Sequence, residues 1–271
     1  MNPERRFAVV TTCHAGGYRD YGQIMVETYL KHWPAEVPLM LYHEGFEPPS
    51  APGRIEPRDL VAASPALMAF KTRHIGNPRA HGKVQPRRRL RIGSMSIPLP
   101  MRGRKAPYRW DAVRFAHKSY AIFDAARRTD ADTRFFADVD MAELDALAPP
   151  DSAVSCLRRP NHSECGFVVY NLRHPETRRL LDEFEAMYTQ DLLFAEREFH
   201  DSFLFDIVRQ RAETRGARTH DIAEGAGARA SHVLINSRLG RFMDHMKGDR
   251  KTEGKSRAGD LLVKRDEAYW K

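Results

Sequence analysis

Short apolar runs alternate with segments of helical periodicity in the first part of the chain. Residues 7–12 form an apolar run that predicts a buried first strand, and a glycine pair after it predicts a loop. Apolar positions within 21–33 recur at the spacing of an amphipathic helix, and 37–42 predicts a second strand. A strand, a helix and a strand in this order predict a βαβ unit with parallel strands.

The alternation continues along the rest of the chain. The further helices that we expect span 59–70, 110–128, 175–190 and 201–212. The further strands that we expect span 133–140, 153–157 and 167–171. The pattern therefore predicts an α/β fold in a single domain over residues 1–271, with a basic loop insertion at 71–109 and a polar C-terminal tail at 252–271.

Composition places the chain among globular proteins. Hydrophobic residues make up 42% of its 271 residues, and the mean hydropathy is −0.58. No apolar run approaches the roughly 20 residues that span a bilayer, and residues 1–6 lack the apolar stretch of a signal peptide. The three cysteines form no CxxC pair, which indicates free, packed thiols in a reducing compartment. We therefore expect a cytoplasmic protein with no transmembrane segment.

Charge is concentrated in one segment. Residues 71–109 contain twelve lysines and arginines and no aspartate or glutamate. Because the whole chain has a net charge of +8, the remaining residues sum to −4. The segment is also rich in glycine and proline, with little helical periodicity, so we expect a long loop without regular structure. An acid-free basic run is typical of a solvated face or of a polyanion-binding surface.

Two acids follow the strand predicted at 133–140. Asp138 and Asp140 are separated by one residue, directly after an apolar run. At the carboxyl end of a parallel strand, such a pair can bind a divalent cation through oxygen, and the cation can neutralise a diphosphate. Acid pairs of this spacing also occur in ordinary solvated loops.

A late segment contains the spacing His-x-x-Gly-x-x-Lys at His245, Gly248 and Lys251. Together with Asp138 and Asp140, it resembles the glycogenin and bacterial lipopolysaccharide galactosyltransferase family, which has the GT-A fold of a twisted mixed sheet with helices on both faces. The resemblance implies that Asp138, Asp140 and His245 bind Mn²⁺ or Mg²⁺, and that Asp138, Gly248 and Lys251 contact the phosphates of a nucleotide-sugar donor, a UDP-sugar. It also implies transfer of a hexose with retention of the anomeric configuration. An imidazole among oxygen ligands favours manganese. Without the glycine and lysine of its motif, His245 would be interpreted as a surface histidine.

Two stretches between these motifs extend the resemblance. Residues 164–171 resemble the family's small-Gly-hydrophobic-Asn stretch beside the donor sugar. Residues 198–202 resemble its acidic segment near the sugar, and also the Trp-His-Asp-Glu segment of blood-group-type glycosyltransferases. The resemblance implies catalytic roles at the donor sugar for Asp201 and His200, with Glu164 nearby. Asp201 is equally suited to begin a helix, and Glu164 fits a general base, a sugar contact or a loop acid.

The residues after the first strand are candidates for nucleotide binding. Thr11, Thr12 and Tyr18 lie where a nucleotide base would sit at the end of that strand. A purely structural role fits the same three residues.

The acceptor is expected to be polyanionic, because a diphosphate alone needs two or three cations. We assign acceptor binding to Arg73, Arg87, Arg88, Arg89 and Arg91 in the basic segment. DNA with a hydroxylated base is the sharpest hypothesis, since neutralising several phosphates gives strong, salt-sensitive binding. A lipopolysaccharide or capsule acceptor is the first alternative. The others are a non-catalytic nucleic-acid-binding protein on a transferase scaffold and a nucleotidyltransferase, which would release pyrophosphate.

Overall fold

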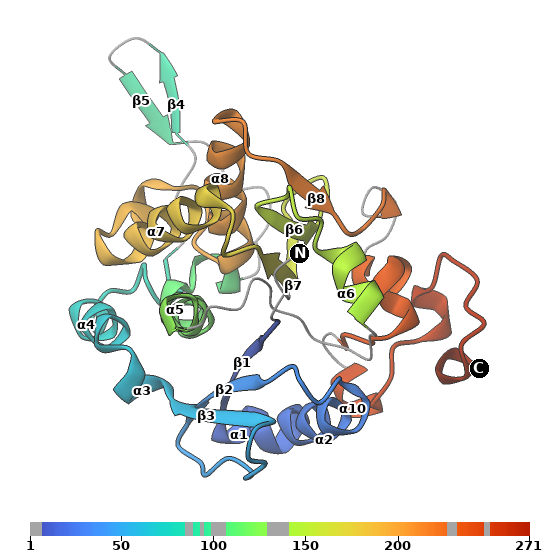
Figure 1. Cartoon of the computed structure of the whole chain (residues 1–271). Helices are drawn as coiled ribbons and strands as arrows, with labels where there is room; N and C mark the ends of the chain where they lie inside the picture. Colours follow the sequence, from blue (N-terminus) through green and yellow to red (C-terminus); the bar gives the residue numbers. More distant parts are fainter. Residues whose placement is uncertain are drawn as a thin grey trace.

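The computed structural model describes residues 7–84, 89–92, 95–98, 107–128, 141–226, 232–246 and 250–271, and it has a mixed α/β architecture (Figure 1). The first sheet has the order β1-β2-β3 and is parallel throughout. Its strands are β1 (Val9–His14), β2 (Leu39–Glu44) and β3 (Ile55–Asp59). The predicted parallel βαβ beginning is therefore confirmed.

The second sheet has the order β7-β6-β8 and is mixed. Its strands are β6 (Val154–Leu157), β7 (Glu164–Tyr170) and β8 (Thr219–Asp221). Strand β6 pairs antiparallel with β7 and parallel with β8. The strands predicted at 153–157 and 167–171 are confirmed, whereas the one predicted at 133–140 lies outside the described residues.

Helices cover both faces of the strands. One hydrophobic cluster contains side chains from α4 (Pro65–His74), α5 (Ala112–Arg128), α7 (Pro175–Thr189) and α8 (Asp201–Thr214). The other contains side chains from α2 (Gln23–His32), α6 (Met141–Leu147) and α9 (Val233–Asn236).

Strand β2 shows why there are two clusters. Leu39 and Leu41 belong to one cluster, and Met40 and Tyr42 belong to the other, because successive side chains of a strand point to opposite faces. Strands of the second sheet also contribute to both clusters, so the two sheets share one core on each face.

The remaining elements are short. They are α1 (Ala15–Gly17), the π-helical turn η1 (Tyr18–Gly22), α3 (Leu60–Ala63), α10 (Arg250–Glu253), and the 3₁₀ turns η2 (Pro107–Trp110), η3 (Leu192–Ala195), η5 (Arg238–Arg241), η6 (Ala258–Asp260) and η7 (Ala268–Trp270). The helix predicted at 59–70 is divided into α3 and α4. Ser64 interrupts it and caps α4 through a hydrogen bond from the backbone of Leu67.

The prediction that the basic segment has no regular structure is wrong in three places, since α4 extends to His74, η2 begins at Pro107, and a hairpin lies between them. Strands β4 (Arg89–Ile92) and β5 (Met95–Pro98) form an antiparallel hairpin. It projects beyond α7 and α8 at the top left of Figure 1. Aliphatic residues alternate with polar ones along both strands, which is the period of a β-strand. The surrounding glycines and prolines concealed this short alternation.

The base of the insertion is closed by backbone hydrogen bonds. The N–H of Gly82 donates to the carbonyl of Trp110 at 3.1 Å, and the N–H of Val113 donates to that of Ala80 at 3.2 Å. The chain therefore leaves the body and returns to it at the same place.

Two further expectations bear on the environment of the protein. The described residues contain no helix that is long and apolar enough to cross a membrane. Cys13, Cys156 and Cys165 are free and buried, as predicted for packed thiols. Burial raises the pKa of Cys13 and of Cys156 to about 11, so both remain protonated at neutral pH.

Candidate active site

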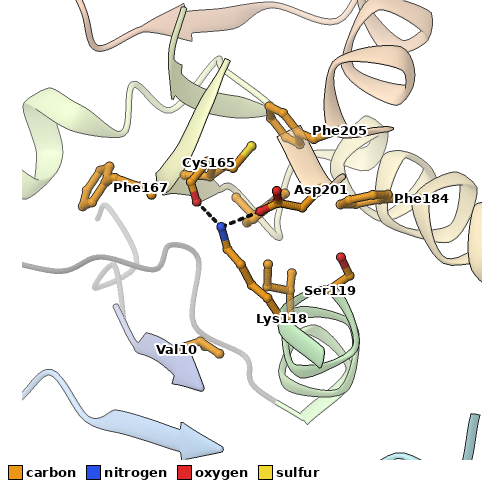
Figure 2. Close-up of a pocket in the computed structure, with 12 residues that line it drawn as sticks. Val10, Lys118, Ser119, Cys165, Phe167, Phe184, Asp201 and Phe205 are labelled. Carbon is orange, nitrogen blue, oxygen red and sulfur yellow. Dashed lines mark hydrogen bonds and ion pairs between the residues drawn. The ribbon is translucent and has the colours of Figure 1, made fainter. Parts of the chain in front are cut away.

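The beginnings of β7 and α8 meet against one side of α5. The ammonium group of Lys118 on α5 forms an ion pair with the carboxylate of Asp201 at 2.8 Å, and it donates a hydrogen bond to the carbonyl of Cys165 (Figure 2). Burial disfavours the charge on Lys118, but the neighbouring carboxylate of Asp201 outweighs it and raises the pKa of the lysine. Lys118 thus joins three elements and stays charged.

Asp201 begins α8 as its first helical residue, whereas His200 occupies the N-cap position. The second carboxylate oxygen of Asp201 accepts a hydrogen bond from the backbone N–H of Ser202 at 2.8 Å. A carboxylate at a helix N-terminus is stabilised by the helix dipole. The side chain is 12% exposed, and it lines a cavity with Val10 and Phe205 (Figure 2).

The late histidine packs against the start of β7. A Cβ atom on Gly166 would lie 2.5 Å from the ring of His245 and 3.3 Å from Oε1 of Glu164. Only glycine allows this approach, since real Cβ atoms do not come so close to other atoms. The structure therefore brings His245 to the stretch that contains Glu164, which is far away in the sequence.

Glu164 is held by a neighbouring loop. Its Oε1 atom accepts a hydrogen bond from the backbone N–H of Gly166 at 3.3 Å. Its other carboxylate oxygen lies 3.2 Å from the guanidinium group of Arg159, between β6 and β7. Glu164 is therefore a buried acid with a defined orientation, which fits a contact residue better than a solvated loop acid.

His200 belongs to a buried cluster of titratable groups. Its Nε2 atom lies 3.1 Å from Glu198, whose carboxylate also accepts two hydrogen bonds from Arg109 at 3.0 and 3.1 Å. Burial lowers the pKa of His200. Burial and the neighbouring His200 ring lower the pKa of His162 to about 4, and the two rings are 4.7 Å apart. Both imidazoles are thus neutral at pH 7.

The parallel sheet ends beside the same helix. His117 on α5 lies 2.6 Å from the carboxylate of Glu44, the last residue of β2. Burial opposes the ionisation of Glu44, but the hydrogen bond from His117 outweighs it and lowers the pKa of the acid. Because His117 and Lys118 are consecutive, one turn of α5 connects the end of the first sheet to Asp201.

The three nucleotide-binding candidates lie at the first sheet. Thr11 and Thr12 are half-buried in β1, paired with the residues of β2. The ring of Tyr18 is stacked on Phe46, with centroids 4.5 Å apart. These contacts account for the position of Tyr18 without a ligand, and they leave nucleotide contact as a prediction.

Most of the predicted metal and phosphate residues lie outside the described part of the chain. These are Asp138, Asp140 and Gly248, together with the side chain of Lys251, whose backbone belongs to α10. Within the described residues there is no group of three or more histidines, cysteines, aspartates or glutamates that could hold a metal. His245 and Glu164 nevertheless place an imidazole and a carboxylate next to each other at Gly166, and metal binding by His245 with Asp138 and Asp140 stays a prediction.

Among the predicted acceptor residues, Arg73 has clear partners. Its guanidinium group donates to both oxygens of Asp191, at 3.0 and 2.9 Å, and to the carbonyl of Tyr188 at 3.1 Å. It therefore holds α4 against the end of α7. Arg87 and Arg88 lie outside the described residues, as do the side chains of Arg89 and Arg91 in β4.

Sequence reasoning missed several residues that orient this site. They are Lys118, Arg109, Arg159 and His162. Lysine on an amphipathic helix and arginine in a loop are typical of solvated positions, and His162 stands alone in a polar loop, so the sequence carries no signal that separates these four from the other polar residues. Comparison of the chain with protein-family models, curated proteins and solved structures finds no match.

Proposed function

We propose that the chain is a metal-dependent glycosyltransferase of the GT-A type, which transfers a sugar from a nucleotide-diphosphate donor to a hydroxyl of a polyanionic acceptor. One observation carries the proposal: His245 packs against Gly166, beside Glu164. The histidine and the glycine come from two separate motifs of the resemblance. A chance likeness gives no reason for these motifs to meet, whereas a shared donor site requires it.

The position of Asp201 supports the same proposal. Lys118 holds its carboxylate at the start of β7, next to the stretch that contains Glu164. An ionised carboxylate offers roughly four acceptor sites. Lys118 and the N–H of Ser202 use two of them, so Asp201 keeps capacity for hydroxyl groups of a donor sugar.

The roles of the other residues follow from the resemblance. Asp138, Asp140 and His245 would hold manganese or magnesium, and Gly248 and Lys251 would contact the diphosphate of a UDP-sugar. An ion bound there supplies positive charge that offsets the charge of the departing diphosphate. His200 is neutral at pH 7, since its pKa is lowered, so it offers hydrogen bonds rather than charge. One parallel and one mixed sheet, with helices on both faces, are compatible with an α/β fold of the GT-A type, although the single mixed sheet that we expected is divided into two.

Thermal unfolding in the presence of UDP, GDP and ADP, each with and without manganese, tests this function. A ligand that binds only the folded state at about 100 times its Kd stabilises the protein by about 2.7 kcal/mol. We expect one nucleoside diphosphate to raise the midpoint in the presence of manganese, and Asp140→Ala to abolish the effect. The proposal is wrong if no nucleoside diphosphate raises the midpoint under any of these conditions.

Analysis of the reaction products separates the proposal from its rivals. A glycosyltransferase releases a nucleoside diphosphate from the nucleotide-sugar, whereas a nucleotidyltransferase releases pyrophosphate. A non-catalytic polyanion-binding protein releases neither, and its affinity for polyanions would be unchanged by Asp140→Ala.

A further inference from the structure

The hairpin β4–β5 places its aliphatic residues on one face. In its register Leu90 is opposite Ile97, and Ile92 is opposite Met95. Directly opposite residues of an antiparallel pair lie on the same face, and so do alternate residues of one strand. Positions 90, 92, 95 and 97 therefore share a face, and the alternate positions of Arg89 and Arg91 belong to the other.

This aliphatic face is open to solvent where it is described. Met95 is 63% exposed and Ile97 is 42% exposed. A two-stranded hairpin is marginally stable in water unless its apolar face packs against something. The exposure of two large aliphatic side chains on a projecting hairpin thus indicates a surface that a partner covers.

Other apolar side chains are exposed around the base of the insertion. Val84 is 48% exposed and Tyr108 is 44% exposed. The chain segments that hold these two residues approach each other, because the carbonyl oxygen of Pro107 would lie 2.5 Å from a Cβ on Gly82. Ile75, after the end of α4, is 81% exposed.

The charge around the hairpin identifies the partner as anionic. Lysines and arginines occur on both sides of the hairpin's aliphatic positions 90–97, at 87–91 and at 102–105. No acid occurs between 71 and 109. Arg73 and Arg109 are paired with Asp191 and Glu198 in the body of the protein. In the sequence, the segments 87–91 and 102–105 that flank the aliphatic run add seven further lysines and arginines.

The type of apolar residue distinguishes a lipid surface from a nucleic acid. Single-stranded nucleic acids are bound by aromatic rings on which bases stack, and Tyr108 is the sole aromatic residue between 71 and 109. Isoleucine, leucine and methionine instead enter the boundary between lipid headgroups and acyl chains, while lysine and arginine attract anionic headgroups.

We propose that the hairpin β4–β5 binds the surface of an anionic lipid bilayer, with its aliphatic face in the interface and the acid-free basic sequence around it attracting the anionic headgroups. This inference concerns the partner of the basic segment and does not depend on the proposed sugar transfer.

Sedimentation with extruded vesicles tests the proposal without donor, metal or acceptor. We expect the full chain to bind vesicles that contain phosphatidylglycerol, and to bind vesicles of pure phosphatidylcholine at least about tenfold more weakly, because the basic residues contribute only on an anionic surface. The double variant Met95→Ser/Ile97→Ser should lower binding to the anionic vesicles about tenfold, since it removes buried methylene groups from the interface.

Two matched variants control for general effects. Ile24→Ser/Leu262→Ser removes two side chains that are 59% and 61% exposed elsewhere on the protein, and we expect it to bind vesicles as the unchanged chain does. Met95→Leu/Ile97→Leu keeps the aliphatic face and should retain binding. All variants are compared by circular dichroism and thermal unfolding.

Three results would overturn the proposal. One is equal binding to the two kinds of vesicle, and another is equal loss of binding in the hairpin and control variants. The third is tight binding of a single-stranded oligonucleotide that the double serine variant retains, with no binding to vesicles, because a nucleic acid would then be the partner of the basic segment.

Discussion

Lys118 is the residue on which the geometry of the candidate site depends most. Its ammonium group binds the carboxylate of Asp201 and the carbonyl of Cys165 at once. Loss of this group would leave a largely buried carboxylate without its cation, and buried charges are costly unless they are paired. Lys118 acts through Asp201, so we regard it as a positioning residue.

We expect Lys118→Met to lower kcat for sugar transfer by about a hundredfold, because misplacing a site group by about 1 Å can cost that much. Lys118→Arg keeps the charge and should recover part of the loss. Arg127→Met removes an exposed ion pair with Glu185 from the same helix and should leave kcat unchanged. Steady-state kinetics would contradict the role of Lys118 if its methionine variant matched that of Arg127.

His162 and His200 make stability depend on pH. The pKa of His162 falls from 6.5 to about 4 on folding, mainly through burial. Between these values the unfolded chain binds more protons than the folded one, so stability is complete above pH 6.5 and declines as the pH falls toward 4. Burial raises the pKa of Glu198, but His200 and Arg109 outweigh this effect and lower the pKa. Protonation of Glu198 at low pH therefore lowers the stability of the folded protein further.

His162→Phe should reduce the number of protons taken up on unfolding between pH 6.5 and 4 by up to about one. The measurement is the free energy of unfolding from urea titrations at several pH values, which gives the slope directly. Above pH 7 the pH dependence of the variant and of the unchanged protein should coincide. An equal slope between pH 4 and 6.5 would show that His162 titrates normally in the folded state.

At the scale of elements, the sequence predicts the long amphipathic helices best. The helices α5, α7 and α8 were expected within two residues of their ends, because their apolar faces repeat over several turns. Strand β3 was missed because only its first residue, Ile55, is buried. Strand β8 was missed because it has three residues and no large apolar side chain.

The candidate site could be predicted from the sequence only where a motif marks it. The stretches around Glu164, Asp201 and His245 were found by ordered resemblance, and their proximity is a result of the structure. The partners Lys118 and Arg109 could not be found, since they pair with residues more than 80 positions away, and pairings at that distance are set by the packing of helices.

The closed base of the insertion depends on Gly82. This glycine has a φ of +65°, and a Cβ there would lie 2.5 Å from the carbonyl oxygen of Pro107. We expect Gly82→Ala to lower the free energy of unfolding by about 1–3 kcal/mol, as is usual for left-handed strain. Gly76→Ala is the control, because no atom lies within 4 Å of the added methyl. Urea titration that gave equal values for both variants would contradict a tight base.

At the scale of the whole molecule, positive charge is concentrated in one segment of the sequence. The basic segment contains twelve cations, while the rest of the chain is net negative. The acids that orient the site are paired with single cations, such as Glu164 with Arg159 and Asp201 with Lys118. The molecule therefore combines an α/β body that holds the acids with a basic insertion whose anionic partner is proposed above.

The central claim is that two acids from the middle of the chain and a late histidine bind one divalent ion. Titration with Mn²⁺, followed by electron paramagnetic resonance of the free ion, tests it directly. We predict that Asp140→Ala and His245→Ala each weaken manganese binding by at least about tenfold, and that Asp182→Ala, on the exposed face of α7, leaves it unchanged. Manganese affinity that is the same in all three variants would contradict the claim.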